Sequence, residues 1–136
     1  MKFLLDNNLP PNWAGMLQAV SRFQFPPVHV EQVSHLRELF APDTADLDWI
    51  GKLSLQQGWT IISGDAFRKK NGAERKVIQQ RGLSVCVLQP SWSSYPFWEK
   101  TPQIVHWWPR IVDQANSVER IAMQIPWMIS GRFTQL

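Results

Sequence analysis

The chain has 136 residues, of which 44% are hydrophobic and 18% are charged, and its net charge is +3. This ordinary composition excludes a disordered or fibrous chain, and the length fits one domain over residues 1–136 with a single hydrophobic core. The lone cysteine, Cys86, lies in an apolar run, which indicates an inert core thiol and a reducing compartment. The sequence contains no membrane-spanning run and no recognisable signal peptide, so we expect a cytoplasmic protein without membrane contact.

The first half of the chain alternates between extended and helical patterns. Residues 2–6 form a short apolar run that predicts a buried strand, and a helix should begin near Pro11 after an asparagine-rich turn. A second extended run is expected at 28–30, after two prolines. Thr44 is the predicted N-cap of an amphipathic helix that ends near Gly58.

The alternation continues in the second half. Residues 59–62 predict a strand because they are apolar and β-branched, and a basic helix follows around 73–81. The continuous apolar run at 83–88 is typical of a strand in the middle of a parallel sheet, where both faces are covered. These patterns predict a three-layer α/β/α sandwich with a largely parallel central sheet.

The last third of the chain is expected to be less regular. After an irregular loop over 90–96, residues 97–116 predict a long helix with a break or kink at Pro109. A last strand is expected at 121–125, followed by a loosely packed tail that reaches Phe133. The chain also contains eight tryptophans. We interpret the closely spaced ones first as core, with stacking on unpaired bases as the alternative, and they are Trp92, Trp98, Trp107 and Trp108.

Acidic and basic residues are segregated along the sequence. A fold that brings the two groups together would set a carboxylate pocket beside a cationic rim, as a metal-dependent enzyme acting on a polyanion requires, although a basic run is more commonly a solvated helix face. The acids of the first fifty residues are Asp6, Glu31, Glu38, Asp43, Asp46 and Asp48, and the bases of residues 68–81 are Arg68, Lys69, Lys70, Arg75, Lys76 and Arg81.

Two acids directly follow predicted strands. Asp6 comes at the end of the first strand and Asp65 just after the strand at 59–62, so both are expected at the edge where parallel strands present their carboxyl ends. Carboxylates that converge there would suit Mg²⁺ or Mn²⁺. Asp46 and Asp48 could supply a third carboxylate, or they could simply complement the positive end of their helix.

Three motifs, taken in order, resemble the PIN-like superfamily, and within it the small bacterial PIN-domain toxins of toxin–antitoxin pairs. The resemblance covers residues 1–90, and its motifs are FLLDNNLP at 3–10, DTADLDWI at 43–50 and WTIISGD at 59–65. It implies a Mg²⁺- or Mn²⁺-dependent ribonuclease in which Asp6, Asp46 and Asp65 are catalytic metal ligands, and it favours Asp46 over Asp48. This chain has Phe67 where many PIN domains carry a further acid, so either Glu74 compensates or a second metal site is absent.

The same resemblance assigns supporting roles. Asn8 would hold a ligand or phosphate, although as a turn residue it needs no such role, and Ser63 would support Asp65. The expected partners are RNA and an antitoxin protein, and a homodimer is left open. The alternative function is a catalytically weak PIN-like module that binds RNA or a protein partner. The residues expected to contact the RNA backbone are Arg68, Lys69, Lys70 and Arg75.

Other chemistries find little support in the sequence. The three histidines, His29, His35 and His106, are not at a short metal-ligand spacing and have no cysteine partner, which argues against a zinc site. Neither a phosphate-binding loop nor a dinucleotide fingerprint is present.

Overall fold

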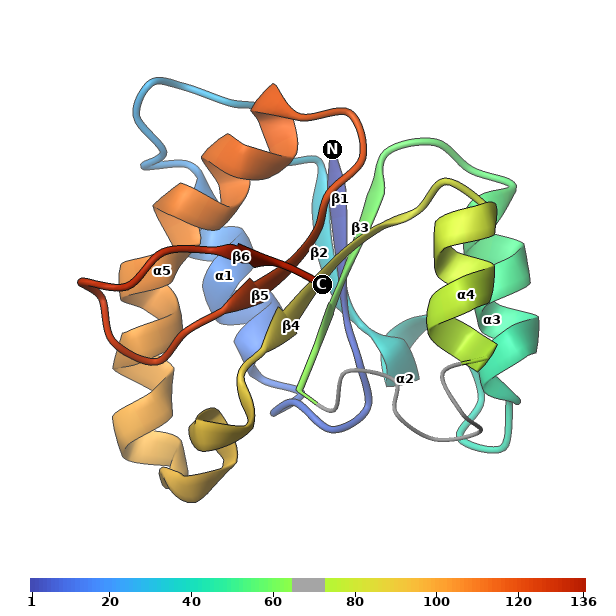
Figure 1. Ribbon diagram of the computed structural model, residues 1–136, viewed down its shortest axis with the longest axis horizontal. Coiled ribbons are helices and arrows are strands. Elements are labelled where there is room, and N and C mark those ends of the chain that lie inside the picture. Colours follow the sequence, from blue (N-terminus) through green and yellow to red (C-terminus); the bar gives the residue numbers. More distant parts are fainter. Residues whose placement is uncertain (65–72) are drawn as a thin grey trace.

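The computed structural model describes residues 1–64 and 73–136, and within the second range the side chains of residues 73 and 75 are not described. Six strands form one sheet in the order β2-β1-β3-β4-β5-β6, and only the last pairing, β5 with β6, is antiparallel. The predicted α/β fold with a largely parallel sheet is therefore confirmed (Figure 1). The strands are β1 (Lys2–Leu5), β2 (Gln32–His35), β3 (Trp59–Ser63), β4 (Ser84–Leu88), β5 (Ala122–Ile125) and β6 (Thr134–Gln135).

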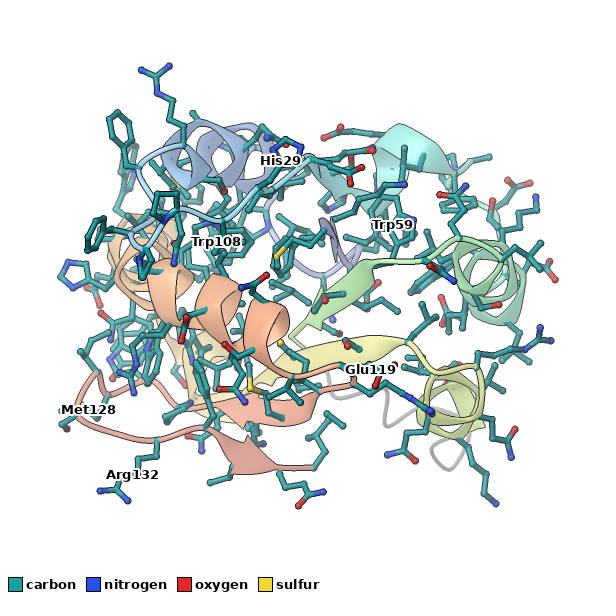
Figure 2. All side chains as sticks on the ribbon, turned by 90° about the horizontal axis from the view of Figure 1, so that it is seen from above. His29, Trp59, Trp108, Glu119, Met128 and Arg132 are labelled. Carbon is teal, nitrogen blue, oxygen red and sulfur yellow. The ribbon has the colours of Figure 1, made fainter. Side chains whose placement is uncertain are left out.

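Helices cover both faces of the sheet, as the two views show (Figures 1 and 2). Alternate residues of β1 point to opposite faces, so Phe3 and Leu5 join one apolar cluster and Leu4 joins another. The expected single core is thus two clusters, one on each face. The first cluster lies under α1 (Trp13–Ser21) and α5 (Phe97–Ser117). The second lies under α2 (Leu36–Leu39), α3 (Asp46–Ser54) and α4 (Ala73–Gln80). A 3₁₀ helix, η2 (Pro90–Ser94), precedes α5.

The register of the central strands aligns their carboxyl ends. Leu5 of β1 lies opposite both His35 of β2 and Ile62 of β3. The turns at the other edge use glycine where the backbone requires a positive φ, at Gly58 (89°) and Gly82 (73°). The residues that follow β1, β2 and β3 consequently emerge at one edge of the sheet, which we call the carboxyl edge.

The second strand lies later in the chain than the sequence indicated. The extended run at 28–30 is not a strand, and β2 begins at Gln32 instead. The amide side chain of Gln18, on α1, accepts a hydrogen bond from the Val33 N–H (2.6 Å) and donates to the Val30 carbonyl (3.4 Å). These contacts from a neighbouring helix, which local sequence patterns do not contain, satisfy backbone groups on the outer side of this edge strand.

The N-cap predicted for α3 is wrong, and the predicted break at Pro109 is absent. Ala45, not Thr44, is the N-cap of α3, and it makes no side-chain cap. The helix at 97–117 runs without a break through Pro102 and Pro109. Tertiary packing stabilises the continuous helix, because Trp107 and Trp108 just before Pro109 are buried.

The C-terminal tail is packed, contrary to expectation. Its last residues form β6, which pairs with β5. Phe133 packs against Trp107 with ring centroids 5.1 Å apart, and the Arg110 guanidinium donates to the carbonyls of Ile129 (2.9 Å) and Gly131 (3.2 Å). Long-range contacts therefore order a segment that lacks a strong local pattern.

Most tryptophans lie in the core, as interpreted from the sequence. Trp108, labelled in Figure 2, packs against Phe3 at 4.7 Å and donates its indole N–H to Ser21 (2.9 Å). Trp98 is the exception, because 82% of it is exposed. Among the residues that the structure describes, no helix is long and apolar enough to cross a membrane.

The buried thiol of Cys86 provides a test of this core. Desolvation raises the pKa of this thiol far above its ordinary value, so little thiolate is present at neutral pH. We expect the native protein to react with a disulfide reagent such as DTNB at least a hundredfold more slowly than the urea-unfolded chain. Rapid labelling of the native protein would contradict the placement of Cys86 in β4.

Candidate functional site

Asp6 is the first residue after β1 and is held in one orientation. Its backbone N–H donates to the Ile62 carbonyl (2.9 Å), which keeps it in line with the sheet. One carboxylate oxygen accepts from the Asn7 backbone N–H (2.7 Å) and the other from the Ser63 hydroxyl (2.9 Å). Only 7% of Asp6 is exposed. A buried carboxylate at the carboxyl edge is thus oriented by groups from β3 and from the loop after β1.

Ser63 and Asn8 connect the loop after β1 to the end of β3. The Ser63 hydroxyl, expected to support Asp65, donates to Asp6, while Asp65 itself lies outside the described residues. The side-chain carbonyl of Asn8 accepts from the Gly64 N–H at 3.1 Å. Both side chains therefore hold together two segments that are far apart in the sequence, and this arrangement positions Asp6.

His35 anchors the same loop from the other side. It is fully buried, and its Nε2 lies 2.9 Å from the Leu9 carbonyl oxygen. A carbonyl can only accept, so Nε2 donates, while Nδ1 accepts from the Arg37 N–H at 3.2 Å. Glu38 completes a capping box by accepting from the His35 N–H at 3.3 Å. His35 thus links β2, α2 and the loop that carries Asp6.

Sequence reasoning missed His35 and Arg37. The Arg37 guanidinium donates through Nε to the side-chain carbonyl of Asn7, the residue after Asp6, at 2.6 Å. The spacing of His35 and Glu38 is that of a capping box, but histidine is not one of its usual N-cap residues, so the sequence carried only a weak signal. The position of Arg37 gave no comparable signal, because its partner lies thirty residues away.

Asp46 lies in the first turn of α3 and shares a cavity wall with the loop after β1. The cavity has a volume of about 60 Å³, and Asn7, Arg37, Asp46 and Trp49 are among the residues that line it. Trp49 donates its indole N–H to Asp46 at 3.1 Å. Asp48, in the same turn, is exposed and does not line this cavity.

Glu74 is a buried acid in the first turn of α4. It is 1% exposed, and within the part of the chain that the structure describes neither of its carboxylate oxygens has a hydrogen-bond partner. Burial of a carboxylate without a partner is costly, so such a group is a candidate ligand for a cation. The helices α3 and α4 both begin at the end of the molecule where β1 and β3 end (Figure 1).

Several predicted site residues lie outside the described residues. They are Asp65, Phe67, Arg68, Lys69 and Lys70, together with the side chain of Arg75. Within residues 1–64 and 73–136, no group of three His, Cys, Asp or Glu side chains is close enough to hold a metal ion. Carboxylates are the donors that Mg²⁺ and Mn²⁺ prefer, so the donor chemistry fits, but a three-acid site would need Asp65.

Larger hollows lie elsewhere on the molecule. One, of about 390 Å³, is lined by Arg81 and Arg120 at the opposite edge of the sheet, and another, of about 410 Å³, is lined by Phe25 and Arg110. Of the candidate acids that the structure describes, Asp6, Asp46, Asp48 and Glu74, none lines either hollow. The chemistry of the side chains, rather than cavity size, therefore directs attention to the carboxyl edge.

Comparison with protein families shows which family the chain belongs to. A family model described as a PIN like domain matches residues 1–90, and the chain therefore belongs to the PIN-like family, a superfamily generally of nucleases. The matched segment includes Asp6, Asp46, Asp65 and Glu74, and it ends before α5. Searches of curated proteins and of solved structures gave no match.

The hydrogen bonds of His35 generate the first prediction for this site. Substitution His35→Ala removes a buried ring, leaves the Leu9 carbonyl without its donor and breaks the cap of α2. We expect a loss of about 2–4 kcal/mol in the free energy of unfolding, measured by urea denaturation. His106→Ala, on the exposed face of α5, is the matched control and should change stability by less than about 0.5 kcal/mol.

The buried carboxylate of Glu74 generates the second prediction for this site. Substitution Glu74→Met keeps the volume and removes an unpartnered charge, so in EDTA it should raise the free energy of unfolding by about 1 kcal/mol or more and the melting temperature by several degrees. Glu119→Met is the control, because Glu119 is exposed (labelled in Figure 2) and the change should be near zero. A Glu74→Met variant less stable than wild type would show that this carboxylate has a stabilising partner.

Proposed function

We propose that the protein is a metal-dependent ribonuclease in which Asp6, Asp46 and Asp65 hold Mg²⁺ or Mn²⁺. The observation that carries the proposal is the oriented carboxylate of Asp6, whose neighbour Asn7 shares a cavity wall with Asp46, in a chain of a family that consists generally of nucleases. In the sequence Asp65 comes two residues after Ser63, the last residue of β3 and the one whose hydroxyl contacts Asp6.

The acids would act as follows. A bound divalent cation would polarise a scissile phosphate and lower the pKa of a coordinated water. The hydrogen bonds from Ser63 and Asn7 keep the Asp6 oxygens in fixed directions, so Asp6 pays little entropy on binding a cation. The hydrogen bond from the Trp49 indole N–H likewise keeps one oxygen of Asp46 in a fixed direction. The low exposure of Asp6 also strengthens its interaction with a cation, because water screens it less.

The site has two further candidate acids. Glu74 would add a carboxylate where Phe67 replaces the acid that many PIN domains carry, and its lack of a hydrogen-bond partner among the described residues leaves both oxygens available. Asp48 is the weaker candidate, since it is exposed and outside the cavity lined by Asp46. RNA would be held by the cationic residues Arg68, Lys69, Lys70 and Arg75, with Asn8 in a structural role that ties two loops together.

The biological role proposed is the toxin of a toxin–antitoxin pair, with an antitoxin protein as its partner. The support is the order and spacing of the motifs at 3–10, 43–50 and 59–65. A short neighbouring reading frame with a DNA-binding pattern would add to it. The second candidate function, a catalytically weak PIN-like module that binds RNA or a protein, is favoured by a single observation, the phenylalanine at position 67.

Metal binding separates these two functions. Titration of Mn²⁺ into the apo protein should raise its melting temperature and give saturable binding by calorimetry, and Asp6→Asn or Asp65→Asn should weaken that binding at least tenfold. Cleavage of a single-stranded or structured RNA should require the metal and fall at least a hundredfold in the same variants. Asp113→Asn, an exposed acid on α5, is the control and should behave as wild type.

Three outcomes would decide between the candidates. Equal residual cleavage by wild type and Asp65→Asn would indicate a contaminating nuclease. The absence of Mn²⁺ binding that depends on Asp6 would exclude the metal-dependent enzyme, and RNA binding without metal binding would favour the second function.

A further inference from the structure

Arg37 is the cation best placed to act at the carboxyl edge among the described residues. It lies in α2, next to the end of β1 (Figure 1), and its side chain lines the cavity that Asn7 and Asp46 also line. The distribution of charges along the sequence points instead to residues 68–81, because Arg37 stands alone among acids in its own segment. Only the folded chain brings it to Asn7, the residue after Asp6.

Hydrogen bonds fix both the backbone and the side chain of Arg37. Its backbone N–H donates to Nδ1 of the buried His35 (3.2 Å), and its Nε donates to the Asn7 side chain (2.6 Å). Asn7 in turn donates its own backbone N–H to Asp6 (2.7 Å). The guanidinium is thus connected through one residue to the candidate metal ligand, and little of its conformational freedom remains to be lost when it binds a ligand.

The charge of Arg37 is not neutralised by the acids around it. Glu38 is its chain neighbour and Asp46 shares its cavity, yet within the described residues Arg37 forms no ion pair, and its two Nη groups have no hydrogen-bond partner. An arginine that uses one N–H to fix its orientation keeps four for a ligand. This is the donor arrangement that binds a phosphate with two parallel hydrogen bonds.

We propose that Arg37 is an RNA phosphate-binding residue of this site. It would contact a backbone phosphate next to the scissile bond and offset the repulsion between the carboxylates and the polyanion. Asn7 is then a positioning residue, which acts by orienting the guanidinium. The inference rests on the proposed ribonuclease function, because it takes RNA as the ligand. It concerns a residue that is not one of the proposed metal ligands.

The alternative is that Arg37 merely clamps α2 to the loop after β1. Binding of RNA separates the two roles, since a clamp affects stability alone. The experiment measures fluorescence anisotropy of a labelled 12-nucleotide single-stranded RNA with the full chain, in EDTA to prevent cleavage, at several salt concentrations. Thermal unfolding of each variant is recorded in parallel.

The expected results differ among the variants. Arg37→Gln should weaken RNA binding about tenfold and reduce the slope of log K against log salt by about 0.7–1, because one phosphate contact is lost. Arg37→Lys should keep the salt slope but bind several-fold more weakly than wild type, since lysine lacks the planar fork. Asn7→Ala should weaken RNA binding less than Arg37→Gln does, because the variant keeps the charge of Arg37. Arg22→Gln, an exposed arginine after α1 that lies over Phe23, is the control and should bind as wild type.

An Arg37→Gln variant with wild-type affinity and salt slope would overturn the proposal, whatever its stability. Mn²⁺ binding, measured on the same variant, distinguishes this failure from failure of the enzyme. If wild type and Arg37→Gln both bind Mn²⁺ and bind RNA equally well, only the role of Arg37 is wrong. If wild type binds neither Mn²⁺ nor RNA, the proposed ribonuclease function fails and the role of Arg37 fails with it.

Discussion

The parallel pairing of β1 with both β2 and β3 is the constraint on which the candidate site depends. Because Leu5 lies opposite His35 and Ile62, the next residues of all three strands emerge at the same level of the sheet. Asp6, the start of α2 and Ser63 are therefore neighbours, although up to 57 positions separate them in the sequence. A shift of one residue in either pairing would turn the apolar side chains of β1 to the wrong faces, so packing of both clusters enforces this register.

The polar contacts at this edge form a continuous set around that register. Asp6 is held by Ser63 and Asn7, the loop after it is held by Asn8 and His35, and Arg37 returns to Asn7. Ser63 and His35 satisfy buried groups, the Asp6 carboxylate and the Leu9 carbonyl, that would otherwise lack these partners, which helps to make so polar an edge compatible with a stable fold. Glu74 departs from this pattern among the described residues, and a buried group that costs stability is common where a protein binds a ligand.

Much of the fold could be predicted because its signals are local. The apolar run of β4, the β-branched β3 and the glycines at 58 and 82 are recognisable from a few adjacent residues. The errors occurred where distant residues decide. Gln18 stabilises the edge strand β2, buried tryptophans keep α5 continuous through Pro109, and Trp107 with Arg110 orders the tail. No window of neighbouring sequence contains those contacts.

For the candidate site, the sequence by itself determined which side chains can carry the chemistry, namely acids placed at or shortly after the ends of apolar strands. The tertiary structure decided how these groups are oriented: the Ser63 contact with Asp6, the His35 anchor, the cavity beside Asp46 and the position of Arg37. The physical reason is that the fold class follows from strand and helix patterns along the chain, whereas a hydrogen bond between residues 26 or more positions apart depends on a register that only packing of the whole sheet defines.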